Sequence, residues 1–230
     1  EAAALNSARH LGRGDKNKAD KAAVDAMRRM FDTLTIDGTV VIGEGEMDEA
    51  PMLYIGEQIG KATEDSIKLD IAVDPLDGTT AVAKGLSGAI SVVAVAPKGC
   101  LLHAPDMYMD KIAVGPRAAG CINLDYSIEE NLKNLSQVLN KDINDITVTI
   151  LDRPRHKELI EKVRDIGARI KLFQDGDVAA AIATCFEDSG VDVLMGIGGA
   201  PEGVIAAAAL KCMGGEFQGR LYPMNREEEN

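Results

Sequence analysis

The chain has 230 residues, of which 46% are hydrophobic, and this is enough to bury a large core in one domain or in two closely packed layers. Its formal net charge is −12 and only 3% of its residues are aromatic. Because nucleic-acid binding needs clustered Lys and Arg for the phosphates and rings that stack on bases, the composition argues against a nucleic-acid-binding protein.

The cysteines and the hydropathy pattern indicate the compartment. The four cysteines are scattered, with no Cys-x-x-Cys pair and no neighbouring His, so neither a zinc site nor a disulfide framework is supported. No apolar run approaches the roughly 20 residues needed to span a bilayer. The scattered cysteines are typical of a cytoplasmic protein. The chain begins with Glu1 and ends on Arg-Glu-Glu-Glu-Asn, so we expect it to be part of a longer polypeptide. The cysteines are Cys100, Cys121, Cys185 and Cys212.

Two helices are predicted at the start of the chain, over residues 2–11 and about 18–34. The second carries Asp20 on its apolar face, and a buried carboxylate needs partners. Alternatively, Asn17 caps this helix and Asp20 is a structural acid of its first turn. The pattern leaves both interpretations open. The apolar residues that share the face of Asp20 are Val24, Met27 and Phe31.

A short buried strand is predicted over residues 38–43, and an acidic run, Glu44-Gly-Glu-Met-Asp48-Glu49, follows it. Runs of charge are usually solvated loops. This run, however, begins directly at a strand end, and the same is true of the acids after the next strand. We therefore expect both sets of acids to meet in one pocket, with a helix from Pro51 to Gly60 behind the first set.

The central strand, residues 69–73, ends in Asp74-Pro-Leu-Asp77-Gly78-Thr79. Crowded carboxylates repel one another unless protons or cations lie between them, and oxygen-only ligands favour Mg²⁺ or Mn²⁺. Thr79 would place a hydroxyl beside such a metal. The competing interpretation is a surface turn, because Pro, Asp and Gly are also ordinary turn residues.

This segment resembles the Asp-Pro-(Ile/Leu)-Asp-Gly-(Thr/Ser) signature of the metal-dependent, lithium-sensitive sugar and inositol phosphatases. Residues 38–60 resemble the class II (GlpX-type) fructose-1,6-bisphosphatase family. One position departs from that family, which usually carries Glu where this chain has Asp77. Further segments match in the same order, namely residues 11–17, 103–109, 153–156, 175–177 and 196–203.

From residue 146 onward, a strand, a loop and a helix alternate three times, which predicts parallel strands with crossover helices. The unusual residues lie at the carboxyl ends of the strands, where open α/β sheets bind ligands. We expect an N-terminal metal-binding α/β half over residues 1–145 and a parallel βα half over 146–230. The predicted strands are 89–97, 111–115, 146–151, 168–173 and 191–195, and the predicted helices are 157–166, 178–186 and 203–213.

The loops of the second half carry groups suited to a phosphorylated sugar. Arg153 and Arg155, on either side of Pro154, offer forked donors to phosphate oxygens, or else are solvated loop residues. Asp175 and Asp177, around Gly176, can accept hydrogen bonds from hydroxyl groups, although Asp177 also suits a helix N-cap.

Three further residues have both a structural and a functional interpretation. Gly199 lets a phosphate approach backbone amides at a helix start. Glu202 suits the first turn of that helix electrostatically. Tyr108 either packs in the core or presents its hydroxyl to a sugar.

The resemblance implies a layered αβαβα sugar-phosphatase fold and hydrolysis of the 1-phosphate of D-fructose 1,6-bisphosphate in gluconeogenesis and glycerol metabolism, with sedoheptulose 1,7-bisphosphate as a possible second substrate. It also implies Mn²⁺ or Mg²⁺, a homo-oligomer, and no membrane partner. The implied metal ligands are Asp20, Glu44, Asp74, Asp77 and Glu202. The implied catalytic residues are Thr79 and Asp48, with Asp20 as the alternative partner of Thr79. The implied substrate-binding residues are Asp77, Gly78, Thr79, Tyr108, Arg153, Pro154, Arg155, Asp175, Gly176, Asp177 and Gly199.

Two other functions remain open from the sequence. One is an inositol or nucleotide phosphatase of the same superfamily, although the pair Arg153 and Arg155 favours a substrate with a second phosphate. The other is a non-catalytic module that binds metal and sugar phosphate as a sensor, which would need no water-activating hydroxyl at Thr79.

Overall fold

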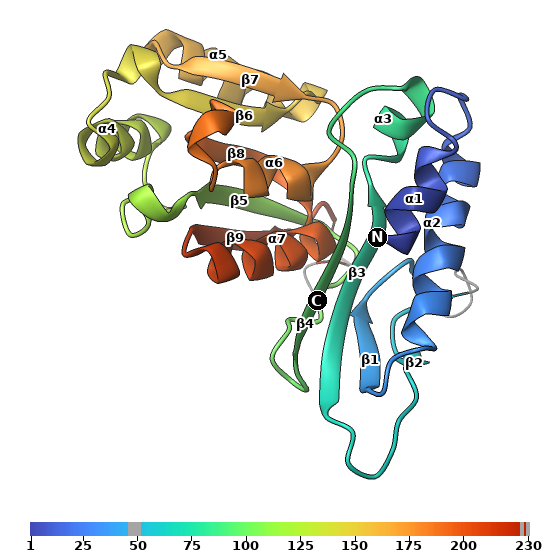
Figure 1. Ribbon diagram of the computed structural model, residues 1–230. Helices are drawn as coiled ribbons and strands as arrows, with labels where there is room; N and C mark the ends of the chain where they lie inside the picture. The colour runs from blue at the N-terminus through green and yellow to red at the C-terminus, as the bar shows by residue number, and fades with distance from the viewer. Residues whose placement is uncertain (46–51, 226–227, 229–230) are drawn as a thin grey trace. The chain divides into compact units, whose positions relative to one another are not determined.

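A computed structural model describes residues 1–45, 52–225 and 228 (Figure 1). The chain forms two compact units, residues 1–105 and 106–230, and each is described by itself. This division falls earlier than the expected one after residue 145, because strand β5 (Tyr108–Val114) pairs with two strands from the end of the chain. Within the described residues, no helix has both the length and the apolar character that crossing a bilayer requires.

The N-terminal unit is a mixed four-stranded sheet in the order β2-β1-β3-β4. Strand β1 runs parallel to β3, and the outer pairs are antiparallel. Helices α1 and α2 cover one face of this sheet, and their apolar residues form the core with β1 and β3 (Figure 1). The elements are α1 (Ala2–Ala8), α2 (Lys16–Phe31), β1 (Asp37–Ile42), β2 (Gln58–Ile59), β3 (Lys68–Asp77), α3 (Thr79–Lys84) and β4 (Ile90–Pro97).

Helix α2 begins earlier than predicted. Its N-cap is Asp15, whose Oδ1 accepts a hydrogen bond of 3.0 Å from the backbone N–H of Lys18. The expected cap at Asn17 is therefore wrong, since Asn17 already lies inside the helix. Asp20 consequently belongs to the second turn, where a carboxylate gains little from the free N–H groups of the helix start. The predicted apolar face is confirmed, because Val24, Met27 and Phe31 are all buried.

The predicted helix from Pro51 to Gly60 is wrong over its described part, residues 52–60. These residues form turns and then β2, which pairs with β1. Gly56 and Gly60 have φ values of +92° and +93°, a left-handed backbone that interrupts any helix. The pairing of a short strand with β1 thus outweighs the local pattern of apolar residues.

A bulge in β3 decides where the motif acids point. Asp74 lies opposite Val92 of β4 and Asp77 lies opposite Ile90, so β3 contains one residue more than β4 between these pairs. In a regular strand, residues three apart lie on opposite faces. The extra residue cancels this alternation, because a bulge sets two residues against one. Asp74 and Asp77 therefore share one face of the sheet.

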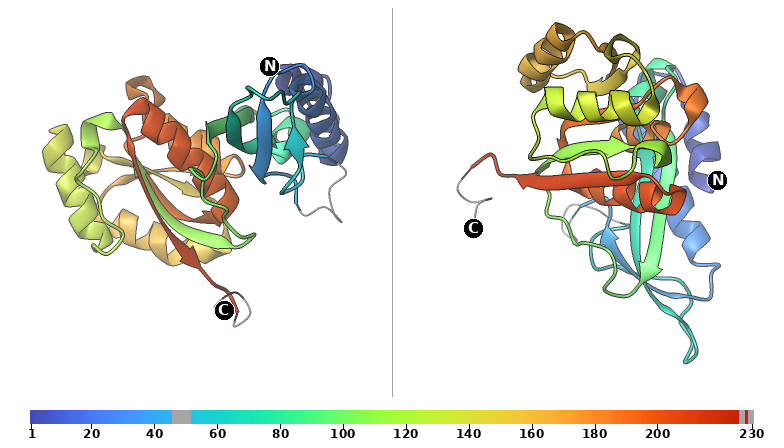
Figure 2. Two further views of the ribbon diagram at one scale, coloured as in Figure 1. Left: turned by 90° about the horizontal axis from the view of Figure 1, so that it is seen from below. Right: turned by 90° about the vertical axis from the view of Figure 1, so that its left-hand side faces the viewer.

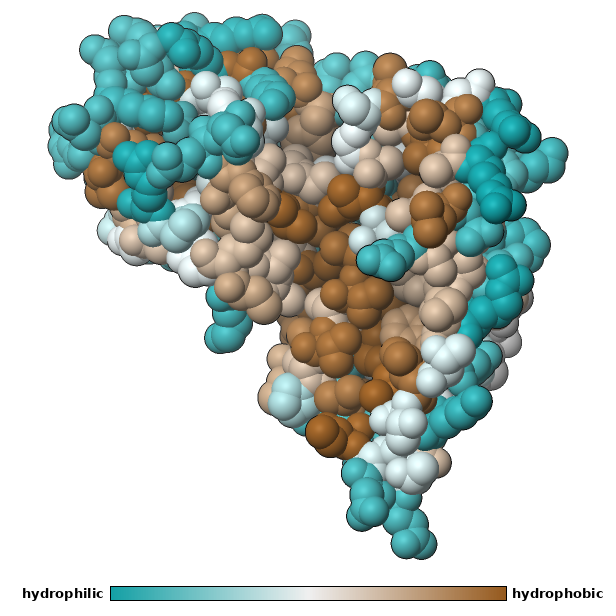
Figure 3. Space-filling model, in the orientation of Figure 1, coloured by the Kyte–Doolittle hydropathy of each residue, from teal (hydrophilic) through white to brown (hydrophobic). Residues whose placement is uncertain are grey.

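Strand β4 forms one edge of this sheet. Val93 and Val95 lie opposite Val73 and Ile71 of β3, which are buried under the helices. Helix α1 contacts only the start of β4, around Ile90 and Ser91, and Val93 and Val95 remain 43% and 55% exposed. Figure 3 shows hydrophobic residues gathered along this strand.

The C-terminal unit is a mixed five-stranded sheet in the order β7-β6-β8-β5-β9. The predicted parallel part is confirmed, since β6 runs parallel to β7 and to β8, whereas β5 pairs antiparallel with β8 and β9. Helices α4 and α5 pack on one face, and α6 and α7 lie on the other (Figures 1 and 2). The remaining elements are α4 (Ile128–Leu139), β6 (Thr147–Leu151), α5 (Lys157–Ile166), β7 (Arg169–Phe173), α6 (Asp177–Ala183), β8 (Val193–Gly199), α7 (Ala200–Met213), β9 (Glu216–Tyr222), and the 3-10 helices Pro116–Ala118, Ile143–Asp145, Pro154–His156 and Glu187–Ser189.

Candidate active site

Two acids of the N-terminal unit, Glu44 and Asp20, lie close together at the end of β1. Burial and the nearby charge of Asp20 raise the pKa of Glu44 to about 7. Burial also raises the pKa of Asp20. Each shift means that the charged form is disfavoured until a cation approaches. This pair therefore has the character of a cation site.

The chain crosses itself tightly beside Glu44. The N–H of Glu44 donates to the carbonyl oxygen of Leu53 over 3.0 Å. A Cβ on Gly43 would lie 1.9 Å from the same oxygen, which no side chain tolerates. Gly43 is thus required for the crossing that holds Glu44 against the end of β1.

The motif after β3 combines a turn with a buried acid. Asp74 Oδ1 accepts a hydrogen bond of 3.0 Å from the N–H of Leu76, so the turn interpretation is correct for this oxygen. Asp77 is only 6% exposed, which a solvated surface turn does not explain. Gly78 has a φ of +99° and caps helix α3, so Thr79 occupies the first position of that helix. Asp74, Asp77 and Thr79 therefore lie along one short stretch of backbone.

In the C-terminal unit, both predicted arginines are held by backbone carbonyls. Arg155 donates from Nε and Nη2 to the carbonyl oxygen of Ile197, at 3.0 and 2.8 Å, and its guanidinium lies 4.7 Å from the ring centre of Tyr108. Arg153 donates to the carbonyl oxygen of Gln174 over 2.8 Å. These contacts fix the planes of the guanidinium groups at the strand ends, where a bidentate contact to phosphate requires fixed geometry.

His156, to which the sequence assigned no role, ties this loop to the sheet. Its Nδ1–H donates to the carbonyl oxygen of Leu151 at 2.6 Å, and Nε2 accepts from the N–H of Ile197 at 2.8 Å. The ring is therefore neutral with its proton on Nδ1. Burial lowers the pKa of His156. A Cβ on Gly196 would lie 3.0 Å from Nε2, so the ring lies directly against the backbone of β8.

Asp177 is the first residue of α6, and Gly176 caps that helix with a left-handed backbone. The alternative that Asp177 is the N-cap is therefore wrong. Its Oδ2 instead forms an ion pair with the ammonium group of Lys111 on β5. The sequence analysis assigned no role to Lys111. The pattern that hinted at one is a lysine at the start of an otherwise apolar strand, residues 111–115.

Glu202 lies in the first turn of α7, as predicted. Its Oε2 is buried, and among the described residues it has no hydrogen-bond partner. A Cβ on Gly199 would lie 2.0 Å from this oxygen, so the carboxylate folds back over the glycine. A buried carboxylate oxygen without a donor is costly, and a cation is the natural complement.

The structure brings the predicted residues together in two groups. Asp20, Glu44, Asp74, Asp77, Gly78 and Thr79 belong to the N-terminal unit, and the other predicted residues belong to the C-terminal one. Asp48 lies outside the described residues. Within residues 1–45, 52–225 and 228, no three His, Cys, Asp or Glu side chains are already arranged as a metal site. Within its own unit, Glu44 with its raised pKa and Glu202 with its unpartnered oxygen nevertheless each fit a divalent cation.

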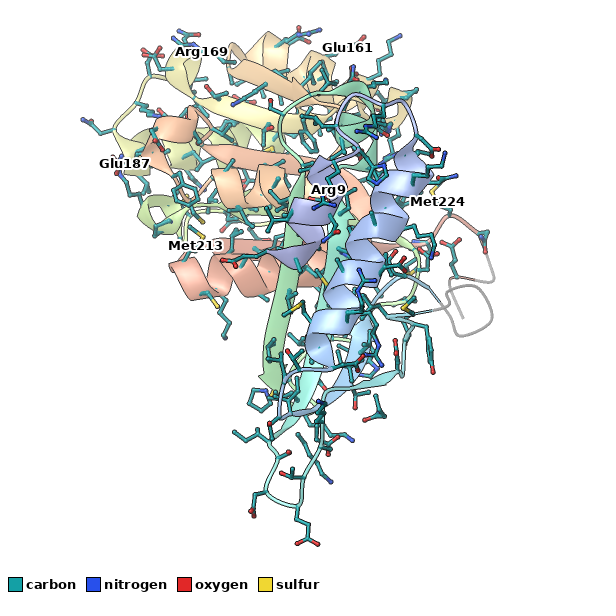
Figure 4. The ribbon with its side chains drawn as sticks, turned by 45° about the vertical axis from the view of Figure 1, so that its right-hand side comes forward. Arg9, Glu161, Arg169, Glu187, Met213 and Met224 are labelled. Carbon is teal, nitrogen blue, oxygen red and sulfur yellow. The ribbon has the colours of Figure 1, made fainter. Side chains whose placement is uncertain are left out.

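A cavity lies elsewhere in the C-terminal unit. It has a volume of about 120 Å³ and includes Arg117, Lys141, Phe186 and Asp192 in its lining. None of the predicted residues lines this cavity, and it lies near the amino end of β8. Glu187 also lines the cavity, and Arg169, the first residue of β7, lies at the same amino end of the parallel strands (Figure 4). The cavity thus lies at the end of the sheet away from Arg153, Arg155 and Asp177.

Comparison with known proteins identifies relatives over nearly the whole chain. The family model described as bacterial fructose-1,6-bisphosphatase, glpX-encoded, matches residues 1–230. The chain is 54% identical over 221 residues to fructose-1,6-bisphosphatase 1 class 2 of Escherichia coli strain K12, covering 96% of this chain and 65% of that protein. It is 50% identical over 231 residues to D-fructose 1,6-bisphosphatase class 2/sedoheptulose 1,7-bisphosphatase of Synechococcus sp. strain JA-2-3B'a(2-13), covering 96% and 67%. The chain thus spans about two thirds of the length of these relatives.

Proposed function

Because the chain belongs to the glpX-encoded bacterial fructose-1,6-bisphosphatase family, we propose that it hydrolyses the 1-phosphate of D-fructose 1,6-bisphosphate to give fructose 6-phosphate and phosphate. The observation that carries the proposal is the match over all 230 residues, which includes every acid, arginine and glycine discussed above. The shared face of Asp74 and Asp77 supports it independently, because that face concentrates negative charge beside a hydroxyl.

We assign the acids of both units to a divalent metal, Mn²⁺ or Mg²⁺. Such an ion would neutralise the phosphoryl group and acidify a bound water. Glu44 and Asp20 suit one ion, because each is half-buried and its charge is disfavoured without a cation. Asp74 and Asp77 suit a second ion in the N-terminal unit, and the unpartnered Oε2 of Glu202 suits a cation in the C-terminal unit.

The chain's own residues supply orientation and binding. Thr79 directs its hydroxyl at the attacking water, and either Asp48 or Asp20 accepts a hydrogen bond from that hydroxyl. Arg153 and Arg155 hold the phosphate that is not cleaved, because their guanidinium planes are already fixed. Binding energy from this distant phosphate positions the reacting one. The remaining substrate contacts are assigned to Gly78, Tyr108, Pro154, Asp175, Gly176, Asp177 and Gly199.

Sedoheptulose 1,7-bisphosphate is a second proposed substrate. It is favoured by the Synechococcus relative, whose name includes that activity and which is 50% identical to this chain. We further propose a cytoplasmic protein that acts in gluconeogenesis and assembles as a dimer or tetramer of identical chains.

A phosphate-release assay with Mn²⁺ or Mg²⁺ tests the function. The substrates are fructose 1,6-bisphosphate, sedoheptulose 1,7-bisphosphate, inositol 1-phosphate and a nucleoside monophosphate. We expect release from the two sugar bisphosphates and little from the others. Faster release from inositol 1-phosphate would favour a different phosphatase of the same superfamily, and sugar phosphate binding without release from any ester would favour a sensor.

A further inference from the structure

The ion pair between Lys111 and Asp177 is unusual in its burial. The side chain of Lys111 is 1% exposed and that of Asp177 is 16% exposed. Removing an ammonium group from water is costly, and the loss is recovered only by a close, well-oriented counter-charge. Lys111 therefore cannot leave Asp177 without losing its charge compensation, and the Oδ2 atom of Asp177 is held in one place.

The backbone of β8 closes around this pair. A Cβ on Gly198 would lie 2.4 Å from Asp177 Oδ2 and 3.0 Å from Lys111 Nζ. The backbone of Gly198 is not left-handed, so a larger residue could adopt its conformation. Glycine is needed here because any side chain would collide with Asp177 and Lys111. A Cβ on Gly203 would lie 3.3 Å from Lys111 Cε, so a second glycine lines the lysine stem. The strand end is thus shaped to admit the pair.

The carboxylate that Lys111 holds belongs to the predicted substrate loop. Asp177 opens helix α6 directly after Gly176, and part of its side chain remains accessible to solvent. A carboxylate has two oxygens, and each can accept hydrogen bonds. With Oδ2 bound by Lys111, the accessible side of the carboxylate has a defined direction.

We propose that Lys111 is a positioning residue that orients Asp177 to accept a hydrogen bond from a hydroxyl group of the sugar. This proposal rests on the proposed function, because it requires a sugar phosphate as ligand. Lys111 does not touch the substrate. The oriented carboxylate favours the sugar part of the ligand and not its phosphate, since Asp177 accepts hydrogen bonds from hydroxyl groups and repels phosphate oxygens.

A purely structural ion pair would behave differently. Buried ion pairs contribute little net stability compared with apolar residues of similar size. Loss of such a pair would weaken all ligands equally through partial unfolding. Loss of a positioning pair weakens the sugar phosphate and leaves inorganic phosphate unaffected.

The test is calorimetric titration of the whole chain, with Mn²⁺ present, by fructose 6-phosphate and separately by inorganic phosphate. Lys111→Met removes the ammonium group, and Gly198→Ala displaces Asp177 while keeping both charges. Lys141→Met is the matched control, because Lys141 pairs with Asp192 over 2.5 Å elsewhere in the same unit. Thermal unfolding of each variant identifies those that remain folded.

We expect both site variants to weaken fructose 6-phosphate binding about tenfold, with inorganic phosphate changed less than about twofold. Lys141→Met should change neither. If Lys111→Met does not fold, the two titrations of Gly198→Ala test the proposal by themselves. Unchanged sugar phosphate binding in a folded site variant, or equal losses for both ligands, would overturn the proposal. Failure of the unmodified chain to bind fructose 6-phosphate would refute the proposed function itself and the positioning role with it.

Discussion

Replacing Glu44 by Gln should stabilise the metal-free protein at alkaline pH. The pKa of Glu44 is raised from 4.5 to about 7, so the folded state binds its proton more tightly than the unfolded state does. The metal-free protein therefore loses stability as the pH rises from about 4.5 to about 7. Each pKa unit corresponds to about 1.4 kcal/mol, which gives an upper limit of about 3 kcal/mol. Since Glu44 is only partly buried, we expect about 1–2 kcal/mol.

The assay is urea unfolding with a chelator present, at about pH 5 and about pH 8. Glu44→Gln should match the unmodified protein at the lower pH and exceed it at the higher one. Excess Mn²⁺ should reverse the order at the higher pH, because the amide lacks the charge that binds a cation. The matched control is Glu64→Gln, since Glu64 is exposed on a loop of the same unit. An equal gain at both pH values would refute the link to ionisation.

Three further results are expected. Thr79→Ala should lower kcat by at least about a hundredfold with little change in KM, measured by phosphate release, and normal turnover would remove Thr79 from the chemistry. His156 is held neutral, so its folded pKa lies below its unfolded value of about 6.5; the stability that this ring contributes is present above that pH and is lost as the pH falls. An NMR titration should show the Nδ1–H form persisting below about pH 6.5, whereas an ordinary titration curve would contradict the burial argument. Gly43→Ala should cost about 2–3 kcal/mol in urea unfolding, because its Cβ would meet the Leu53 carbonyl oxygen, and a loss near zero would mean that the crossing relaxes.

The C-terminal alternation was predictable because its signals are local. Strand β6 and helix α5 follow from short apolar runs and a helical pattern, and β7 and β8 align parallel to β6 as expected. Helix α4 was missed, although Ser127 carries a visible signal. Its hydroxyl accepts from the N–H of Glu130, which is half of the Ser-x-x-Glu capping pattern.

Other features depend on contacts between distant residues. The bulge that turns Asp74 and Asp77 to one face exists only through the register with β4. The pairing of β2 with β1 replaces the helix expected from Pro51 to Gly60. Lys111 is a single lysine whose partner lies 66 positions away in the chain. A short stretch of sequence does not predict these features, because each depends on which strands become neighbours in the folded sheet.

The edge strand β4 has a consequence for the behaviour of this chain in solution. From Ile90 to Pro97 it carries no charged residue and no proline before its last position, although the whole chain has a net charge of −12. Natural sheets usually guard an outer strand with lysines, prolines or a covering element, because an unguarded one recruits other polypeptides. Long-range repulsion between acidic molecules is weak at physiological ionic strength, where screening acts within about 8 Å. Concentrated preparations are thus expected to self-associate along this border first, and salt will hasten it.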